Sequence, residues 1–516
     1  MDYKHRVYYQ ILNYAFFDSN GDGIGDFKGI ASKLNYLKDL GVGGIWLSPI
    51  HQSDSYHSYD VIDYRSEKSD YVVDGYGIDD LINDANKYDI AIMLDMVFNH
   101  SSLNHKWFQG AVAYALGLST DSSYKDFYVF SKTKVEDKGW YEYNMQGKSI
   151  WYYGSFSPTM PDLNYSATFD YDNDPVFKAV VEEFKFWIDK GVYAFRLDGI
   201  RHFYELEQKV EDVPSNQKFL SALCGKIKEY NKDVFILGEA FIKDERLGPF
   251  AVGVDSLINF PVANQLKNLF CTSGDIINYA KQMQIECRKY QEDFVLTNMI
   301  SSHDEGTGRF SANVSSDINK MYIGAMLNIM LPGIPFIYYG DEVGLLAVRE
   351  YTDPKFKDEF IDAINRTPMP WDKNEMQAHY ILDTVRSKNN EIILSRCDTV
   401  GTVYDKPICD VLKDKSSLYY YYRSLIDVRN MYPDLFYKGS VQDYYTAWTQ
   451  SKVLYYDVIY KDEVLGVVIN ISDSENEYNI NKPFKILNSL AKDSSISKES
   501  DTKLSMPPVS LTIIKY

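Results

Sequence analysis

Short apolar runs alternate with amphipathic stretches over the first two thirds of the chain. The apolar runs have the length of buried strands, and the stretches between them carry apolar residues at helical spacing. Strands are predicted at 7–12, 44–47, 90–97, 193–197, 234–237, 256–259, 294–299 and 334–339. Helices are predicted at 27–40, 176–190, 206–230, 275–290, 318–330 and 416–429. Alternating strands and helices build parallel sheets, and eight such strands are enough to close a (β/α)8 barrel.

Two regions interrupt this alternation and a third ends it. Residues 101–166, after the third strand, are rich in Tyr, Ser, Asp and Lys with weak periodicity, which predicts a small inserted domain. The long excursion 343–415 is expected to wall the site, because loops of that length usually carry function. From about residue 437 the pattern becomes short alternating strands, which predicts a C-terminal antiparallel β-sandwich. We therefore expect the barrel at 1–100 and 167–436, the inserted domain at 101–166 and the β domain at 437–516.

One stretch has the length of a membrane span, because residues 321–340 carry no charge. Asn328, Pro332, Gly333 and Pro335 divide it, so we predict a buried helix followed by a short strand, and no membrane span. The chain begins MDYKHRVYYQIL, without a basic segment followed by a long apolar one. This favours a cytoplasmic protein, the alternative being a secreted or surface-anchored protein whose signal has been removed.

The composition excludes one class of partner. There are 54 Lys and Arg against 73 Asp and Glu, a formal charge of −19 that repels a phosphate backbone, so no nucleic-acid binding is expected. The five cysteines are widely spaced, without a CxxC pair, which favours free thiols. The chain has 44 Tyr, an aromatic load that either fills cores or lines a surface for flat, hydroxyl-rich ligands. We expect a monomer.

Candidate catalytic groups stand where the predicted strands end, which is where barrel enzymes place reacting groups. Asp198 follows the fourth strand, Glu239 the fifth, and His303 and Asp304 the seventh. Any one of them alone is more simply read as a capping or solvated loop residue, but together they form a carboxylate cluster without a zinc ligand set. Such a cluster suits glycosyl transfer, in which one carboxylate attacks and another protonates the leaving oxygen.

The electrostatics of this cluster predict distinct roles for its acids. Crowded carboxylates raise one another's pKa, which supplies a proton donor near neutral pH. Arg196 lies two residues before Asp198 and therefore on the same side of the strand, where its charge favours the ionised form that a nucleophile needs. The alternative interpretation of Arg196 is an ion pair in the barrel core.

Several short motifs follow one another along the chain in this order: DMVFNH, MPDLN, GVYAFRLDGIRH, ILGEA, SSHD, LPGIPFIYYGDEVG and RTPMPWD. In this order they resemble the α-amylase family of glycoside hydrolases and transglycosidases over nearly the whole chain. The resemblance implies that Asp198 is the nucleophile, that Glu239 is the general acid/base and that Asp304 fixes sugar hydroxyls and stabilises the transition state.

The same resemblance implies a set of substrate-binding residues, with Tyr59 as the aromatic platform under the sugar. The set is Tyr59, Asp60, His100, Arg196, Arg201, His202 and His303. The chain departs from the family pattern at Ser58, where glycine is usual, and at Ser302, where asparagine is commoner. Arg309 lies two residues further from Asp304 than the usual arginine does, so no role is assigned to it.

A calcium site is expected near the N-terminus, where oxygen ligands alternate with glycines as a hard cation requires. Its ligands would be the side chains of Asp18, Asn20, Asp22 and Asp26 with the carbonyl of Ile24. An EF-hand is disfavoured because Gly29 stands at the twelfth position. The resemblance implies a second, less certain calcium site formed by Asn99, Asp162 and the carbonyl of His202.

The substrate is predicted from motifs that point to two branches of the family. MPDLN lies between the amylase and oligo-1,6-glucosidase patterns, RTPMPWD leans to the second, and Arg201-His202 leans to the first. We expect retaining hydrolysis of α-1,4 bonds in starch-derived maltooligosaccharides and other α-glucans, with side activity on α-1,6 bonds or in transfer. The alternatives are an α-glucosidase or oligo-1,6-glucosidase, and a transglycosidase or isomerase that forms trehalose or longer dextrins. A non-catalytic carbohydrate-binding relative is least favoured, because all three acids are present.

Overall fold

The computed structural model describes residues 3–206, 210–269, 276–304, 306–348, 361–374, 379–386, 392–446, 452–480, 482–492 and 496–516. Its centre is a sheet of parallel strands in the order β13-β12-β9-β5-β2-β1-β15-β14. The strands are β1 (Tyr8–Ile11), β2 (Gly44–Leu47), β5 (Ala91–Met96), β9 (Ala194–Leu197), β12 (Phe235–Gly238), β13 (Ser256–Leu257), β14 (Thr297–Asn298) and β15 (Ile334–Tyr338). A parallel bridge between Ile258 and Thr297 joins the two ends of this order, which confirms the predicted barrel.

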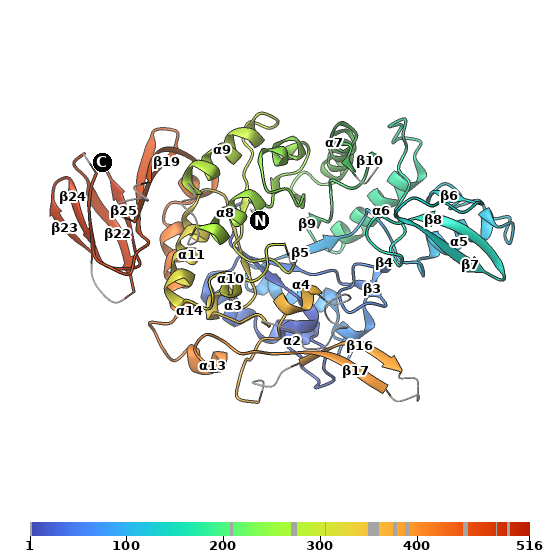
Figure 1. Cartoon of the computed structure of the whole chain (residues 1–516), viewed down its shortest axis with the longest axis horizontal. Helices are drawn as coiled ribbons and strands as arrows, with labels where there is room; N and C mark the ends of the chain where they lie inside the picture. Colours follow the sequence, from blue (N-terminus) through green and yellow to red (C-terminus); the bar gives the residue numbers. More distant parts are fainter. Residues whose placement is uncertain are drawn as a thin grey trace.

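Helices cover the outside of the barrel (Figure 1). They are α1 (Asn13–Phe16), α2 (Phe27–Ser32), α3 (Leu34–Leu40), α4 (Ile78–Lys87), α6 (Pro175–Asp189), α7 (Val213–Tyr230), α8 (Phe260–Asn268), α9 (Ile276–Arg288), α10 (Phe310–Asn313), α11 (Ile318–Met330), α14 (Leu418–Asn430) and α15 (Pro433–Lys438). Their starts follow from local chemistry. In α6, the Asp174 side chain accepts hydrogen bonds from the backbone N–H groups of Val176 and Phe177, and Pro175 stands in the first turn.

Two helix predictions were wrong in their bounds. The stretch 27–40 is two helices, because the backbone leaves the helical conformation at Lys33, with φ −108° and ψ 5°. The stretch 206–230 becomes helical only at Val213, where the Asp212 side chain caps the new helix. Before it, the chain forms a short antiparallel pair, β10 (Glu205–Leu206) with β11 (Val210–Glu211). In both cases apolar residues keep their helical spacing across the point where the backbone is not helical, so the sequence pattern does not show the boundary.

The segment after β5 holds α5 (Lys106–Ala115) and a three-stranded antiparallel sheet. Its strands are β6 (Phe130–Ser131), β7 (Trp140–Met145) and β8 (Lys148–Tyr153). The tyrosines of this segment build its own core: the rings of Tyr128, Tyr143 and Tyr152 lie 5.1, 5.3 and 5.2 Å from that of Phe108. Before it, β3 (His51–Ser53) and β4 (Val61–Glu67) form an antiparallel pair after β2.

The chain after β15 forms an excursion and then two antiparallel sheets. The excursion carries the hairpin of β16 (His379–Arg386) and β17 (Ile392–Asp398), and the short helix α13 (Ile408–Val411). The sheets have the orders β18-β19-β20-β25-β22 and β21-β24-β23. Their strands are β18 (Ser440–Thr446), β19 (Val453–Tyr460), β20 (Glu463–Asn470), β21 (Asn476–Asn479), β22 (Lys485–Ala491), β23 (Ser497–Ser500), β24 (Lys503–Met506) and β25 (Ser510–Lys515). A cluster of buried side chains that includes Val468 of β20 and Leu504 of β24 joins the sheets, as a sandwich requires.

The uncharged stretch 321–340 forms most of α11 and then β15, both buried, as predicted. In the part of the chain that the structure describes, no helix has the length and apolar character to cross a membrane.

Candidate active site

The register of the barrel strands brings the predicted catalytic groups to one edge. Asp95 of β5 and Arg196 of β9 are partners in neighbouring strands. The backbone N–H of Asp198 donates to the Met96 carbonyl at 3.1 Å, and that of Glu239 donates to the Leu197 carbonyl at 3.0 Å. These contacts continue the sheet by one residue beyond the strands, so both acids leave the same end of the barrel.

A single buried guanidinium joins three carboxylates at this edge. Nη1 of Arg196 donates to Asp95 at 2.7 Å and to Asp198 at 2.5 Å, and Nη2 lies 3.7 Å from Glu239 Oε2. The side chains of Arg196 and Asp95 are 2% and 0% exposed, whereas that of Asp198 is 13% exposed. Asp95 is therefore an internal partner of Arg196, whereas Asp198, and Glu239 at 10% exposed, retain access to the solvent.

Glu239 is placed to hold a proton near neutral pH. Burial raises its pKa to about 7, with further increases from the charges of Asp198 and Asp304 that outweigh the opposing effect of Arg196. Its Oε2 accepts a hydrogen bond from the backbone N–H of Gly199 at 2.9 Å, which fixes the carboxyl group. A carboxyl group with this pKa can donate a proton at neutral pH and take one back later in the cycle.

Asp304 is the third acid, and its side chain is 37% exposed. Burial opposes its ionisation, but His303, Arg366 and Arg196 together lower its pKa below the usual value. Burial also lowers the pKa of His303 to about 4, so its ring is neutral at pH 7. The Gln10 amide donates to Nδ1 of His303 at 2.8 Å, which places the imidazole proton on Nε2, 3.3 Å from Asp304.

Tyr59 and His100 complete the rim of this site. The Tyr59 hydroxyl lies 2.9 Å from Nε2 of His303 and donates to Asp95 at 3.3 Å, and its ring is nearly parallel to that of His303. Nε2 of His100 donates to the Tyr59 carbonyl at 3.2 Å, and burial lowers the pKa of His100. Nδ1 of His100 has no hydrogen-bond partner among the described residues and remains an acceptor.

The family model for the catalytic domain of alpha-amylases matches residues 10–439, which include every residue of this cluster. The chain belongs to the alpha-amylase family. It is 31% identical to alpha-amylase 3 of Dictyoglomus thermophilum, over 99% of this chain and 93% of that protein. It is 28% identical to an oligo-1,6-glucosidase of Heyndrickxia coagulans, over 85% of this chain and 86% of that one. The solved structure of Eubacterium rectale Amy13B superposes with a TM-score of 0.81 at 25% identity, covering 100% of this chain and 96% of the other.

Membership of the alpha-amylase family makes this chain a glycoside hydrolase family enzyme with a barrel fold. The structure also accounts for one departure of the sequence from the family pattern. Ser58 adopts φ 62°, the left-handed region in which glycine is usual. Its hydroxyl lies 3.2 Å from the Tyr71 hydroxyl, a contact that a glycine could not make.

Two of the predicted sugar-binding residues lie beside Glu239, and one turns away. Arg201 donates through Nε to Nε2 of His202 at 3.0 Å and through Nη1 to the Phe241 carbonyl at 3.1 Å. Nδ1 of His202 is 2.5 Å from the Glu205 carboxylate. Asp60 instead accepts hydrogen bonds from Ser53 and Ser55 of its own loop, so its carboxylate orders the segment that carries Tyr59.

The N-terminal loop that was predicted to bind calcium is wrapped around its own side chains. Asp18 accepts from the backbone N–H groups of Asn20, Gly21 and Gly23, and the Asn20 amide donates to Asp22. The Asp26 carboxylate accepts from Ser19 twice and from the Gly29 N–H, where it caps α2. Asp26 therefore keeps one of its four lone-pair positions free. Among the described residues no group of three or more His, Cys, Asp or Glu is arranged to hold a metal ion.

The residues of the second metal prediction converge in part. The Asp162 carboxylate accepts from the Ser155 backbone N–H at 2.9 Å, and the Asn99 amide donates to the Ser155 hydroxyl at 3.4 Å. Burial raises the pKa of Asp162 to about 7, with a further increase from the charge of Glu205. A cation bound beside Asp162 would favour the ionised form of its carboxyl group and so oppose this rise in pKa.

Two residues that contact the site were not predicted from the sequence. Gln10 is a buried amide within the apolar strand β1, and that break in an apolar run was the signal for it. Arg366 lies in RTPMPWD, where its Nε donates to the His303 carbonyl at 3.0 Å and its Nη1 donates to the Tyr56 hydroxyl at 3.2 Å. It belongs to the excursion 343–415 that was expected to wall the site, but no pattern in the sequence singled out this residue. Arg309, to which no role was assigned from the sequence, donates a hydrogen bond to the Tyr339 carbonyl.

Proposed function

We propose that this enzyme hydrolyses α-1,4-glucosidic bonds in starch-derived maltooligosaccharides and other α-glucans, with retention of the anomeric configuration. Asp198 is the nucleophile, Glu239 the general acid/base and Asp304 the acid that binds sugar hydroxyls in the transition state. The observation that carries the proposal is the contrast around Arg196: its guanidinium contacts Asp198 at 2.5 Å, whereas burial raises the pKa of Glu239 to about 7. One acid is paired with a cation and the other can donate a proton.

The reaction then has two displacements. The Asp198 carboxylate attacks the anomeric carbon while Glu239 transfers its proton to the glycosidic oxygen, and the sugar chain on that side leaves as an alcohol. The Glu239 carboxylate next takes a proton from water, whose oxygen attacks the same carbon and releases Asp198. Glu239 ends protonated and Asp198 ionised, so the cycle closes without a cofactor as reactant.

The surrounding residues bind the sugars. The Tyr59 ring lies under the sugar at the cleavage point, and His100, which is hydrogen-bonded to the Tyr59 carbonyl, binds beside it. His303 offers the proton on Nε2 to another hydroxyl, while Arg201 and His202 bind the sugar on the leaving-group side. The contacts of Arg201 with His202 and with the carbonyl of Phe241, two residues beyond Glu239, support this, because they fix the two side chains at the segment that follows Glu239.

The second candidate is an oligo-1,6-glucosidase activity. One observation favours it: Arg366 of the RTPMPWD segment contacts the His303 carbonyl, so a motif that leans toward that branch lies against the site. The 28% identity to an oligo-1,6-glucosidase agrees with it.

The division into a barrel at 1–100 and 167–436, an inserted domain at 101–166 and a β domain at 437–516 is part of this proposal, as is a monomeric state. Calcium is proposed at the Asp18–Asp26 loop, where its ligands would be Asp18, Asn20, Asp22, Asp26 and the Ile24 carbonyl. The alternating oxygen donors and the remaining lone pair on Asp26 support this site. The ion would hold the loop between β1 and α2 in one conformation and take no part in the chemistry.

The experiment that tests the function is a chromatogram of the products from maltotriose, starch, pullulan, isomaltose, sucrose and trehalose. We expect short maltooligosaccharides from starch and cleavage of maltotriose, with slower or no reaction of isomaltose, sucrose and trehalose. Isomaltose as the best substrate would select the second candidate. Products longer than the substrate, or isomeric with it, would replace hydrolysis by transfer.

A further inference from the structure

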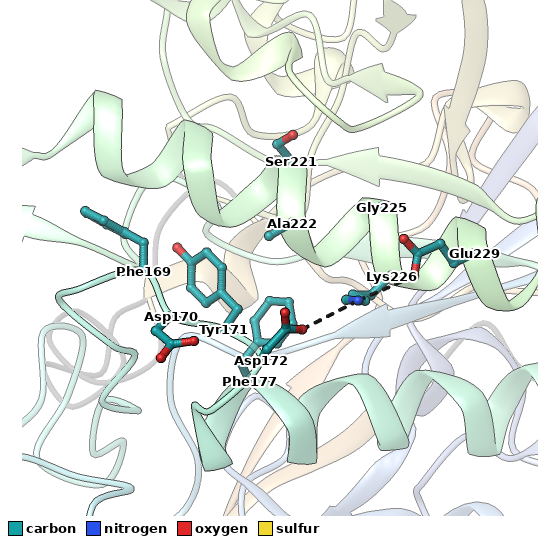
Figure 2. A pocket seen from close by; sticks show the side chains of 10 residues that line it. All are labelled: Phe169, Asp170, Tyr171, Asp172, Phe177, Ser221, Ala222, Gly225, Lys226 and Glu229. Carbon is teal, nitrogen blue, oxygen red and sulfur yellow. Dashed lines mark ion pairs between the residues drawn. The ribbon is translucent and has the colours of Figure 1, made fainter.

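An open pocket of about 320 Å³ lies on the outside of the barrel, between α7 and the segment that leads into α6 (Figure 2). This volume is at the lower end of the range of about 300–1,000 Å³ that is typical of ligand sites. None of the proposed catalytic or sugar-binding residues lines it. The pocket is therefore separate from the site described above.

One wall of the pocket is aromatic. Tyr171 and Phe177 stack with ring centroids 4.7 Å apart at 27°, and Phe169 lies beside Tyr171 at 6.4 Å. Phe177 is buried, whereas Phe169 and Tyr171 are half-buried and keep part of their rings open. Phe169 has φ 59°, a conformation that is unfavourable for an aromatic residue. The chain thus holds aromatic surface open to solvent at a backbone cost.

The opposite wall is a run of small residues on α7. Ser221, Ala222 and Gly225 lie on one face of this helix, because residues three and four apart are neighbours. A methyl group at Gly225 would meet no atom within 4 Å, and Gly225 is not among the glycines with positive φ. Neither backbone conformation nor packing therefore requires glycine there, although glycine weakens a helix interior. The pocket is open at this position because no large side chain stands there.

The rim supplies hydrogen-bonding groups that are only loosely engaged. Lys226 Nζ lies 3.6 Å from Asp172 and 3.5 Å from Glu229, and all three side chains are exposed (Figure 2). Asp170 adds a third carboxylate. Nζ of Lys218 also lies 4.1 Å from the centre of the Phe169 ring, so three acids face two lysines. The surplus of acids disfavours an anionic ligand, and the charged rim disfavours a purely apolar one. A neutral polyhydroxylated ring fits both walls, because its C–H face stacks on an aromatic ring and its hydroxyls bind carboxylates and ammonium groups.

We propose that this pocket, here called the α6/α7 pocket, binds glucosyl units of an α-glucan chain as a second site outside the catalytic cleft. The inference rests on the proposed activity toward α-glucans, which brings such chains to this protein. The pocket adjoins the loop that carries Arg201 and His202. The Tyr171 hydroxyl lies 3.4 Å from that of Tyr204, two residues beyond His202, and Tyr204 donates to the Ser166 carbonyl.

The first test fills the pocket from α7. Gly225→Trp places a large side chain in the open space, and Gly225→Ala is the matched control that leaves it open. The measurement is the retardation of each protein in native gels that contain soluble starch, together with kcat/KM on a short chromogenic maltooligosaccharide. We expect Gly225→Trp to lose affinity for starch about five- to tenfold, the factor for one aromatic stacking contact, with unchanged kcat/KM on the short substrate. Gly225→Ala should behave as wild type.

A second pair of variants covers the case in which Gly225→Trp does not fold. Tyr171→Ala removes the stacking face, and Tyr171→Phe keeps it, so we expect retardation to fall in the first and persist in the second. If folded Gly225→Trp or Tyr171→Ala is retarded as strongly as wild type, the pocket does not bind glucan and the inference is overturned. A wild-type protein that neither cleaves the short substrate nor is retarded by starch would instead overturn the proposed function itself.

Discussion

Arg196 is the residue around which the candidate chemistry is arranged. Its position could be predicted from the sequence, because a residue two before Asp198 in a strand must face the same side. What the sequence does not contain is the third partner, since Asp95 meets Arg196 only through the register of two neighbouring strands. The guanidinium contacts both Asp95 and Asp198, and burial raises the pKa of Asp95 as well as that of Glu239 to about 7. Asp95 is fully enclosed whereas Glu239 is 10% exposed, so Glu239 is the proton donor that a substrate can reach.

The pH dependence of the reaction follows from the raised pKa of Glu239. The first displacement needs its protonated form, so kcat/KM on maltooligosaccharides should fall as pH rises through about 7. The measurement is kcat/KM from about pH 5 to 9. As a control, a maltoside with a good leaving group such as dinitrophenol needs little proton donation, and its high-pH decline should be weaker. Equal declines for both substrates would assign the pH limb to another group.

At the scale of elements, the strands were predicted well and the loops were not. Most barrel strands are compact and mainly apolar, so the pattern shows them directly, whereas β14 is only Thr297–Asn298 within the predicted strand 294–299. The break at Lys33 and the β10–β11 pair depend on tertiary contacts and on a local cap at Asp212, which do not disturb apolar spacing. Arg366 was missed because it lies in a long loop whose path no pattern in the sequence defines, so its contact with the His303 carbonyl could not be foreseen.

The Asp18–Asp26 loop gives a prediction about metal removal. If calcium binds there, chelation should lower the melting temperature and added calcium should restore it, because a ligand at about 100 times its Kd contributes about 2.7 kcal/mol to folding stability. Asp22→Asn keeps an oxygen acceptor for the Ile24 N–H but removes charge, so its melting temperature should respond less to chelation. Identical melting curves for wild type with and without chelator would exclude a stabilising calcium ion.

At the scale of the whole molecule, the tyrosine surplus is mainly a packing device. Seven tyrosines are among the largest fully buried side chains: Tyr8, Tyr9, Tyr64, Tyr71, Tyr152, Tyr338 and Tyr339. Several use their hydroxyls inside the protein, as Tyr9 does toward Glu342. Composition alone could not separate this role from ligand binding, because both need large amphipathic rings. The structure separates them by burial, with Tyr59 at the barrel edge and Tyr171 at the α6/α7 pocket.

The most direct test of the account is the rate at which Asp198→Asn hydrolyses maltooligosaccharides, measured beside its thermal unfolding. Asparagine keeps the shape of the side chain and a hydrogen-bond acceptor for Arg196 but is not a nucleophile. We predict that kcat falls at least about 1,000-fold while the protein remains folded. A folded Asp198→Asn that cleaves maltooligosaccharides at nearly the wild-type rate would contradict the assignment of Asp198, and with it the proposed mechanism.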